Sequence, residues 1–269
     1  MVDYTPAELR AVLEDLPISR GDTLFSHSNL GFFGRAEGLG SAGAVCRLFA
    51  ESVLERIGPE GTLVVPTFTY SFPKGEVFDP DATASDMGMF SEWVRRHDDA
   101  QRSIDPCYSV AAIGGAAKGL TADVPENSFG PDSFFDRFYH AGGKILNFNF
   151  DAGSTFVHYV ERCLDVPYRF DKTFTGRVLM RGEERAARST IWVRYRSDDA
   201  LVAAFEPFDR LARENGLFET RSLGRGEIGL IGATDTYNLI SHTLPSRPLF
   251  LTKAEDLGVT VPHIEPEEE

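Results

Sequence analysis

The sequence predicts an α/β protein with a mixed, mainly parallel central sheet flanked by helices, followed by a C-terminal β-hairpin and helical subregion. Two observations predict this class. Apolar runs typical of buried strands alternate with helix-like periodic segments over residues 1–165, which is the order of a parallel sheet covered by helices. From residue 166 onward, alternating apolar residues flank Arg181-Gly182, a pattern typical of a hairpin.

The length and composition suit one large globular domain. The chain has 269 residues, of which 42% are hydrophobic and 25% are charged, so a sizeable core is available. We expect a single domain with a core at 1–165, a lobe of hairpin and helices at 166–260, and an acidic tail at 261–269. No internal repeat divides the chain.

The charge and the cysteines exclude several classes of protein. A net charge of −14 argues against nucleic acid as a partner, although an acidic surface tolerates cationic ligands. Cys46, Cys107 and Cys163 show no metal or redox spacing, which fits a reduced, cytoplasmic setting and predicts no metal site. We see no signal peptide and no apolar stretch long enough to cross a bilayer, so we expect no membrane partner.

Local signals place the elements of the first half. Thr5, Pro6 and Glu8 form a capping-box start for the first helix. Stops containing glycine, at 58–59 and 142–143, end two later helices. The predicted segments are, in order, a helix from residue 5, a strand at 23–28, a glycine-rich loop to 40, a helix at 41–57, a strand at 61–70, a helix at 86–97, a strand entered through 102–114, a helical turn at 115–120, a helix at 134–140 and a strand at 144–150.

The second half contains fewer helix–strand alternations. A helix begins at Thr155, directly after the strand at 144–150 and the breaking turn Asp151-Ala152-Gly153-Ser154. The later predicted segments are a hairpin at 174–180 and 188–196, a helix at 198–215, short strands near 218–223 and 227–231, and a last helix from Thr234 or Asp235 to about 244.

The helix that begins at Thr155 carries the candidate catalytic residues. Positions three apart on a helix are about 60° apart around its axis, so Thr155, His158 and Glu161 share one stripe. An imidazole can take a proton near neutral pH, a carboxylate can orient it, and a hydroxyl can donate to a developing oxyanion. The stripe therefore suits proton-transfer chemistry.

The same three residues also have ordinary structural interpretations. Thr155 or Ser154 can cap the helix. His158 can be a satisfied surface or core histidine, and Glu161 can pair with Arg162 or Arg169. Taken alone, the three residues favour these structural roles, because ion pairs and caps outnumber active sites.

A glycine-rich loop follows the first predicted strand. The order of strand, glycine loop and helix presents backbone N–H groups to a phosphate or cofactor. The loop has neither the dinucleotide fingerprint nor the spacing of a P-loop. It is equally consistent with an ordinary loop between a strand and a helix.

Several of these segments, in their order along about residues 20–170, resemble the aminoglycoside 3-N-acetyltransferase family, also called the antibiotic N-acetyltransferase family. The resemblance is carried by Ser26-His27-Ser28-Asn29-Leu30, the strand Gly61–Thr69, the blocks Phe90–Arg95 and Arg102–Gly114, Phe129–Ser133, and Thr155-x-x-His158-x-x-Glu161. After Tyr168 the match is poor.

The sequence departs from the family pattern at a few positions. The family usually has a small hydroxyl residue at the position of Asn29 and a histidine at that of Asp105, and Asn147 and Asn149 interrupt a strand that is commonly rich in leucine and glycine. The combination looks closest to members associated with amino sugars of surface polysaccharides. The departures bear on the acceptor more than on the reaction.

The resemblance implies transfer of an acetyl group from acetyl-CoA to an amine, with residues 1–165 binding the cofactor and residues 166–260 forming an acceptor lobe. It implies His158 as the general base, Glu161 as the residue that orients it, and Thr155 or a backbone N–H beside it as the oxyanion donor. It places the pantetheine arm and phosphates of CoA against His27, Ser28, Asn29, Leu30, Gly31, Pro66, Thr67, Arg102, Ser103 and Ser109.

Two of the implied roles have alternatives. Arg102 is expected to contact a CoA phosphate or, equally, to form a salt bridge with Asp98, Asp99 or Asp105. Cys107 offers a rival mechanism through an acetyl-thiol intermediate, but no neighbouring base is visible, so we expect a structural cysteine.

We therefore expect an acetyl-CoA-dependent N-acetyltransferase acting on an amino sugar, with nucleotide-linked amino sugars among the candidates. One alternative is an aminoglycoside 3-N-acetyltransferase that confers antibiotic resistance, for which Asp79, Asp81, Asp86 and Asp105 could line an acidic cleft. Another is a CoA-binding module without turnover, which Asn29 and Asp105 would justify. A homodimer is also expected.

Overall fold

The computed structural model describes residues 2–259, in which strands and helices alternate along most of the chain. The strands are β1 (Thr23–Phe25), β2 (Thr62–Pro66), β3 (Gln101–Arg102), β4 (Val110–Gly114), β5 (Lys144–Phe148), β6 (Arg169–Met180), β7 (Glu183–Arg194), β8 (Glu219–Leu223) and β9 (Gly226–Gly232). The α-helices are α1 (Pro6–Asp15), α2 (Ala42–Ile57), α3 (Met89–Arg95), α4 (Ala117–Thr121), α5 (Phe134–His140), α6 (Phe156–Cys163), α7 (Glu206–Glu214), α8 (Ala233–Thr243) and α9 (Lys253–Leu257).

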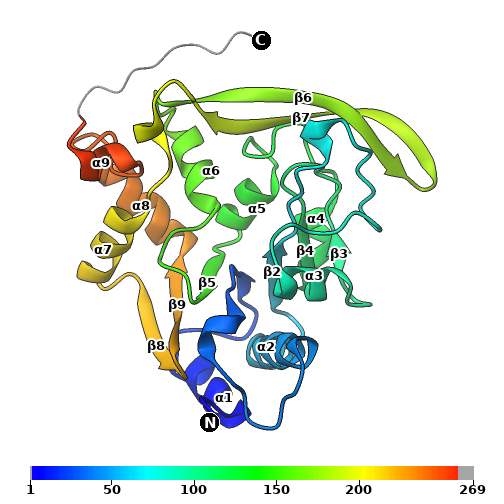
Figure 1. The fold of residues 1–269 in the computed structure, drawn as a ribbon, viewed down its shortest axis with the longest axis vertical. Helices are drawn as coiled ribbons and strands as arrows, with labels where there is room; N and C mark the ends of the chain where they lie inside the picture. Colours follow the sequence, from blue (N-terminus) through cyan, green and yellow to red (C-terminus); the bar gives the residue numbers. More distant parts are fainter. Residues whose placement is uncertain (1, 260–269) are drawn as a thin grey trace.

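Within residues 2–259, seven strands form one sheet in the order β3-β4-β2-β1-β5-β9-β8 (Figure 1). This confirms the mixed α/β class but corrects the expectation that most neighbouring strands pair in parallel. Only β1 pairs in parallel, with β2 and β5 on its two sides, while all the outer pairs are antiparallel. A strand that is buried on both faces has an apolar composition in either direction, so its composition could not distinguish the two.

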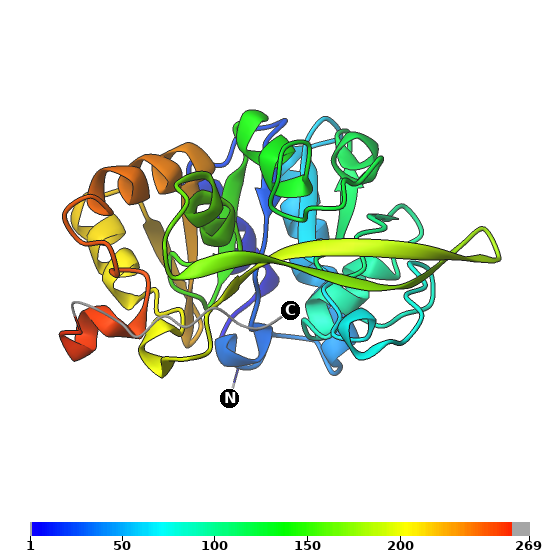
Figure 2. The ribbon, with the colours of Figure 1, turned by 90° about the horizontal axis from the view of Figure 1, so that it is seen from above.

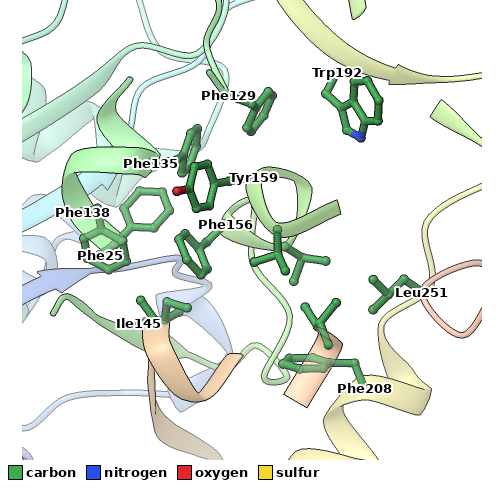
Figure 3. Close-up of a cluster of buried hydrophobic side chains, with 14 of the residues drawn as sticks. Phe25, Phe129, Phe135, Phe138, Ile145, Phe156, Tyr159, Trp192, Phe208 and Leu251 are labelled. Carbon is green, nitrogen blue, oxygen red and sulfur yellow. The ribbon is translucent and has the colours of Figure 1, made fainter. Parts of the chain in front are cut away.

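The sheet is covered on both faces, and alternate residues of each strand enter different cores. Val64 and Ile145 face one core with helices α4 to α8, whereas Leu63 and Leu146 face the other with α1, α2 and α3. Figure 3 shows the first core, in which Phe138 and Phe156 lie beside Ile145 of the central sheet. Each such buried ring contributes about 2–3 kcal/mol, so α6 is fixed firmly to the sheet.

The helix boundaries predicted from short-range sequence signals are confirmed for α1 and α2. The Thr5 side chain accepts from the Glu8 N–H, and the Glu8 carboxylate accepts from the Thr5 N–H, as a capping box requires. Ser41 caps α2, and Gly58 ends it with a φ of 70°. Such a positive φ costs glycine little, which explains the stop.

Helix boundaries in the second half differ from the predictions. The predicted helix at 198–215 is interrupted: a short 3-10 turn at Asp199–Leu201 precedes α7. Pro207 accounts for a start near 206, because proline fits only the first turn of a helix. The last predicted helix begins at Ala233 with Gly232 as its N-cap. The short helix α9 was not predicted.

Strands β6 and β7 form the predicted hairpin, longer than the sequence indicated. Their pairing runs from Arg169↔Arg194 to Met180↔Glu183. The two turn residues, Arg181 and Gly182, both have positive φ, as a tight hairpin turn requires. Figures 1 and 2 show the hairpin lying across one end of the molecule, from beside α6 to past the loop that follows β2.

Residues 260–269, which include the predicted acidic tail at 261–269, lie outside the described residues. Among the helices of residues 2–259, none has the length and apolar character needed to cross a membrane.

Candidate functional site

The site is built where β5 leaves the sheet and α6 begins. Asn149 turns the chain with a φ of 58°, and its side-chain amide joins the Asn29 carbonyl to the Glu227 N–H. The Asn147 amide donates to the carbonyls of Asp151 (2.6 Å) and Gly153 (3.1 Å). Asn147 and Asn149, both of which depart from the family pattern, therefore stabilise the chain where it passes from β5 to α6.

His158 and Glu161 lie on the predicted stripe of α6 and contact each other directly. The His158 Nδ1 is 2.6 Å from the Glu161 Oε2. The imidazole keeps 17% of its side-chain surface exposed, whereas the carboxylate is fully buried. The predicted pairing is present, and the imidazole is not sealed inside the core.

Glu161 has two further partners. The Tyr168 hydroxyl donates to its Oε1 over 2.9 Å, and the Arg169 Nε lies 2.8 Å from its Oε2 in a buried ion pair. Arg162, the other predicted structural partner, instead pairs with Asp171 at the surface. The same carboxylate therefore makes the predicted ion pair with Arg169 and the contact with His158.

The charges around His158 favour a neutral imidazole and an ionised carboxylate. Burial and the nearby Arg169 lower the pKa of His158, although Glu161 acts in the opposite direction. Burial alone would raise the pKa of Glu161, but Arg169 and His158 outweigh it and hold that pKa below its usual value. With Nδ1–H donating to Glu161, Nε2 carries the lone pair that can accept a proton.

Two aromatic rings lie beside the imidazole. Phe129 meets it edge-on with ring centroids 6.2 Å apart, and Phe205 lies 5.8 Å away. They come from the loops before α5 and α7. Their contribution was not predicted, because residues so distant in sequence show no shared periodicity.

Thr155 lies at the start of α6 and contacts His27. The His27 Nε2 is 3.2 Å from the Thr155 hydroxyl and 3.4 Å from its backbone nitrogen. Burial lowers the pKa of His27 to about 4, so the ring is neutral near pH 7 and can accept from this N–H. Neither Thr155 nor Ser154 caps α6 with its side chain, and among the described residues the Ser154 hydroxyl has no partner.

The loop Ser28–Gly31, assigned to the cofactor by the resemblance, lies against the end of β5. Ser28 pairs with Phe148, and the Asn29 N–H donates to the Phe148 carbonyl. Leu30 is buried, whereas Asn29 and Gly31 are exposed. Asn29 opens on a cavity of about 570 Å³. Its lining residues are Asn29, Phe32, Asn149, Phe150, Asp151, Arg213, Ser222, Arg225, Gly226 and Glu227.

The second group of expected cofactor residues lies inside the protein. Thr67, Ser103 and Ser109 are buried, as is Pro66 at the end of β2. The Ser109 hydroxyl donates to the Thr67 carbonyl over 2.7 Å, and the Ser103 hydroxyl accepts from the Val110 N–H. In this structure their polar atoms bind the backbone and are not presented to solvent.

Arg102 also uses its donors within the protein. It donates to the carbonyls of Pro80, Thr83 and Thr67 and lies over the Phe78 ring. Burial lowers its pKa to about 10. Within residues 2–259 the expected salt bridge to Asp98, Asp99 or Asp105 is not formed, and backbone oxygens, mainly of the loop after β2, occupy the guanidinium.

Three of the four acidic residues proposed for a broad acceptor cleft, Asp79, Asp86 and Asp105, have local structural roles. Asp105 is buried, and its Oδ1 accepts from the N–H groups of Cys107 and Tyr108. Asp79 binds the N–H groups of the turn that follows it, and Asp86 accepts from the Tyr70 N–H. These contacts tie the carboxylates to separate turns.

Cys107 fits the expected structural role. It is 5% exposed, and burial raises the pKa of its thiol to about 12. Such a thiol is almost entirely protonated at neutral pH and is a poor nucleophile. Among residues 2–259, no group of three or more potential metal ligands gathers at one place.

Comparisons with known proteins agree on one family. A family model described as aminoglycoside 3-N-acetyltransferase matches residues 26–245. Aminoglycoside N(3)-acetyltransferase IX of Micromonospora chalcea is 26% identical over 263 residues, which cover 87% of this chain and 88% of the relative.

Solved structures share the fold. The structure described as AAC-IIIb binary with CoASH has a TM-score of 0.76 at 21% identity, covering 90% of this chain and 97% of that one. The structure of AAC-VIa bound to sisomicin has a TM-score of 0.77 at 23% identity, covering 91% and 99%. At these identities the two structures show a common fold.

Proposed function

This chain belongs to the aminoglycoside 3-N-acetyltransferase family, and we propose that it transfers the acetyl group of acetyl-CoA to an amine of an aminoglycoside, with His158 as the general base. The observation that carries this proposal is the 2.6 Å contact between His158 and the buried Glu161. The contact leaves a neutral, partly exposed imidazole whose Nε2 can take a proton.

The reaction needs a general base because the acceptor amine must lose a proton. Amines of sugars are largely protonated near neutral pH, and only the free amine attacks a thioester. Acetyl-CoA supplies the activated acetyl group when bound. A neutral His158 accepts the proton that the amine loses, and Glu161 stabilises the imidazolium that results; such a base contributes about 10²–10⁴-fold to a rate.

Thr155 is the proposed oxyanion donor. The unprotonated His27 Nε2 can accept from the Thr155 N–H or from the Thr155 hydroxyl. The hydroxyl proton therefore turns from His27 toward the substrate oxygen when it donates there. The position at the start of α6 adds the positive end of the helix dipole. Loss of such a donor typically costs about 3 kcal/mol of transition-state stabilisation.

The residues beside Asn29 suit the polar arm of CoA. Asn29 and Asn149 both line the cavity, and the exposed side-chain amide of Asn29 can pair with an amide group of pantetheine. The exposed rings of Phe32 and Phe150 offer apolar surface. Within the proposed cofactor set, these contacts favour the loop Ser28–Gly31 over Arg102, whose donors bind the protein itself.

The acceptor is better supported as an aminoglycoside than as an amino sugar of a surface polysaccharide. The relative from Micromonospora chalcea is named an aminoglycoside N(3)-acetyltransferase, and the similar structure of AAC-VIa has sisomicin, an aminoglycoside, bound. Aminoglycosides are polycations, and this chain carries a net charge of −14. The expected polysaccharide acceptor rests only on sequence departures, of which Asn147 and Asn149 have structural roles here.

A CoA-binding module without turnover is the weaker alternative. Asn29 and Asp105 motivated it, but Asp105 is buried and accepts from two backbone N–H groups, which gives it a structural role. The pairing of His158 with Glu161 is intact. We retain the expected homodimer as a proposal that sedimentation velocity would test.

The test is thiol release from acetyl-CoA with sisomicin, gentamicin and a nucleotide-linked amino sugar as acceptors. We expect release with an aminoglycoside, and mass spectrometry should show one added acetyl group on it. Release with the amino sugar alone, or binding of CoA without release on any acceptor, would overturn the proposal. Expression in a drug-sensitive host, with a His158→Ala variant as control, tests whether the activity protects growth.

A further inference from the structure

Glu161 has more partners than a residue that only orients a histidine needs. Its Oε2 contacts both the His158 Nδ1 at 2.6 Å and the Arg169 Nε at 2.8 Å, and its Oε1 accepts from the Tyr168 hydroxyl at 2.9 Å. The carboxylate is fully buried, and Arg169 is 6% exposed at its side chain. The imidazole, with 17% of its side-chain surface exposed, is the most exposed part of this cluster.

The charges of the cluster balance without His158. The guanidinium of Arg169 is always protonated in a protein, so it neutralises the Glu161 carboxylate by itself. A protonated His158 would then add one uncompensated positive charge to a buried group, and such a charge is costly. The resting cluster therefore holds a neutral imidazole.

No other charge near His158 reverses this balance. From its own helix it faces Glu161, and from the start of β6 it faces Tyr168 and Arg169. The loops before α5 and α7 present the uncharged rings of Phe129 and Phe205. At the end of β1, His27 has a pKa of about 4, and on the β4 side burial raises the pKa of Tyr108, so both groups are neutral near pH 7.

We infer that Arg169 and Tyr168 are positioning residues, which hold Glu161 ionised and thereby keep His158 in its proton-accepting form. This inference rests on the proposed function for its catalytic meaning. As the amine nitrogen bonds to the acetyl carbon, its proton passes to Nε2, while the Nδ1–H keeps donating to Glu161. The bond between that carbon and the sulfur of CoA then breaks with its electron pair on sulfur. Arg169 destabilises the imidazolium, so His158 gives up the proton, which reaches the departing thiolate directly or through solvent before the next turnover.

Tyr168 and Arg169 come from the segment that directly follows α6 in the sequence. The Val166 N–H donates to the Glu161 carbonyl, which folds the segment after α6 back on the helix. Tyr168 and Arg169 follow within three residues and enter β6, where Arg169 pairs with Arg194 across the hairpin. The base of the hairpin is thus joined to the catalytic helix through Glu161.

The experiment is an NMR titration of the ¹³C-labelled imidazoles, with His158 assigned by His158→Gln. The variants are Arg169→Gln, Arg169→Lys and Tyr168→Phe. We expect Arg169→Gln to raise the pKa of His158 by about one pH unit or more. The acid limb of the rate profile should rise with it, while the rate at high pH stays within several-fold of the parent.

The other variants separate charge from packing. Arg169→Lys keeps the positive charge and should restore most of the low pKa of His158, whereas Tyr168→Phe should raise it less than Arg169→Gln does. Arg162→Gln is the matched control, because Arg162 lies on the same helix but pairs with Asp171 at the surface. It should leave the titration unchanged.

An unchanged pKa of His158 in both Arg169→Gln and Tyr168→Phe, with a rate lowered equally at every pH, would overturn the inference and leave both residues structural. If Arg169→Gln does not fold, Tyr168→Phe decides: a raised pKa of His158 supports the inference, and an unchanged pKa with a rate lowered equally at every pH overturns it. The titration needs no acceptor. A failed acceptor screen would therefore count against the proposed function and leave the measured effect of Arg169 intact.

Discussion

The His158 Nδ1 lies 2.6 Å from the Glu161 Oε2, one turn later on the same helix, and the carboxylate is fully buried while the imidazole keeps 17% of its surface. This contact gives the imidazole a fixed orientation and leaves Nε2 as its only free acceptor. A small exposed edge is sufficient for proton transfer, and burial around it favours the neutral form.

Glu161→Gln should impair both stability and turnover. The change removes the carboxylate that compensates Arg169, and an unpaired buried charge costs about 3–5 kcal/mol. We expect a fall of that size in the free energy of unfolding and about a 100-fold lower kcat, measured by denaturant unfolding and thiol release. Glu184→Gln, which breaks an exposed pair with Arg177, should cost less than about 1 kcal/mol. Equal effects of the two changes would contradict the assignment.

The acid limb of the rate profile should lie below the ordinary range for histidine. Burial and Arg169 lower the pKa of His158, and the base works only when unprotonated. Turnover should therefore persist as the pH falls through about 6.5, the usual value for a histidine. The measurement is kcat/KM against pH, corrected for the ionisation of the acceptor amine, which is titrated separately. An acid limb above that value would show that the imidazole is charged in the resting protein.

His27 should make the fold sensitive to acid. The unfolded chain takes up a proton at His27 near pH 6.5, but in the folded protein the pKa of His27 is about 4. The contribution of His27 to the free energy of unfolding is therefore fully present above pH 6.5 and is lost as the pH falls toward 4. His27→Gln should lose less stability over that window than the parent by about 1–2 kcal/mol, as measured by thermal unfolding. Parallel losses in the two proteins would count against a buried, neutral His27.

Arg102→Met distinguishes a structural role of Arg102, in which it binds backbone carbonyls, from contact with a phosphate of CoA. Arg102 donates to three carbonyls around the loop after β2, so its loss should lower the free energy of unfolding by about 2–4 kcal/mol. The loop should also become more sensitive to protease. A raised KM for acetyl-CoA with unchanged unfolding would instead favour the phosphate contact.

Cys107 should take no part in the reaction. With a thiol pKa of about 12 and 5% exposure, it should resist iodoacetamide in the folded protein, while the exposed Cys163 reacts. Cys107→Ala should keep turnover within several-fold of the parent. A trapped acetyl-thiol on Cys107, detected by mass spectrometry of quenched protein, would contradict direct transfer.

The catalytic stripe could be predicted because helical periodicity alone decides which residues of a short segment share a face. Thr155, His158 and Glu161 needed no tertiary information to be grouped, and the cap at Thr5 depends on residues three apart. The partners of Glu161 could be predicted only in part. Arg169 was one of two candidates, and the choice between Arg162 and Arg169 depends on how the chain turns after α6.

The roles of residues on different strands could not be predicted in the same way. Arg102, Thr67 and Ser109 come together through the pairing of β2 with β4, whose direction the apolar sequence does not specify. Once paired, these side chains satisfy one another. The role of Asn149 could not be predicted for the same reason. Its positive φ and its side-chain contacts with Asn29 and Glu227 arise only when the end of β5 packs against segments distant in the sequence.

The most direct test of the central claim is the rate of thiol release from acetyl-CoA with an aminoglycoside, compared between the parent and His158→Gln. A glutamine can still donate to Glu161 but cannot accept the amine proton. The account predicts a kcat at least about 100-fold lower at neutral pH, with little change in CoA affinity. Turnover within a few-fold of the parent would remove His158 from the role of base.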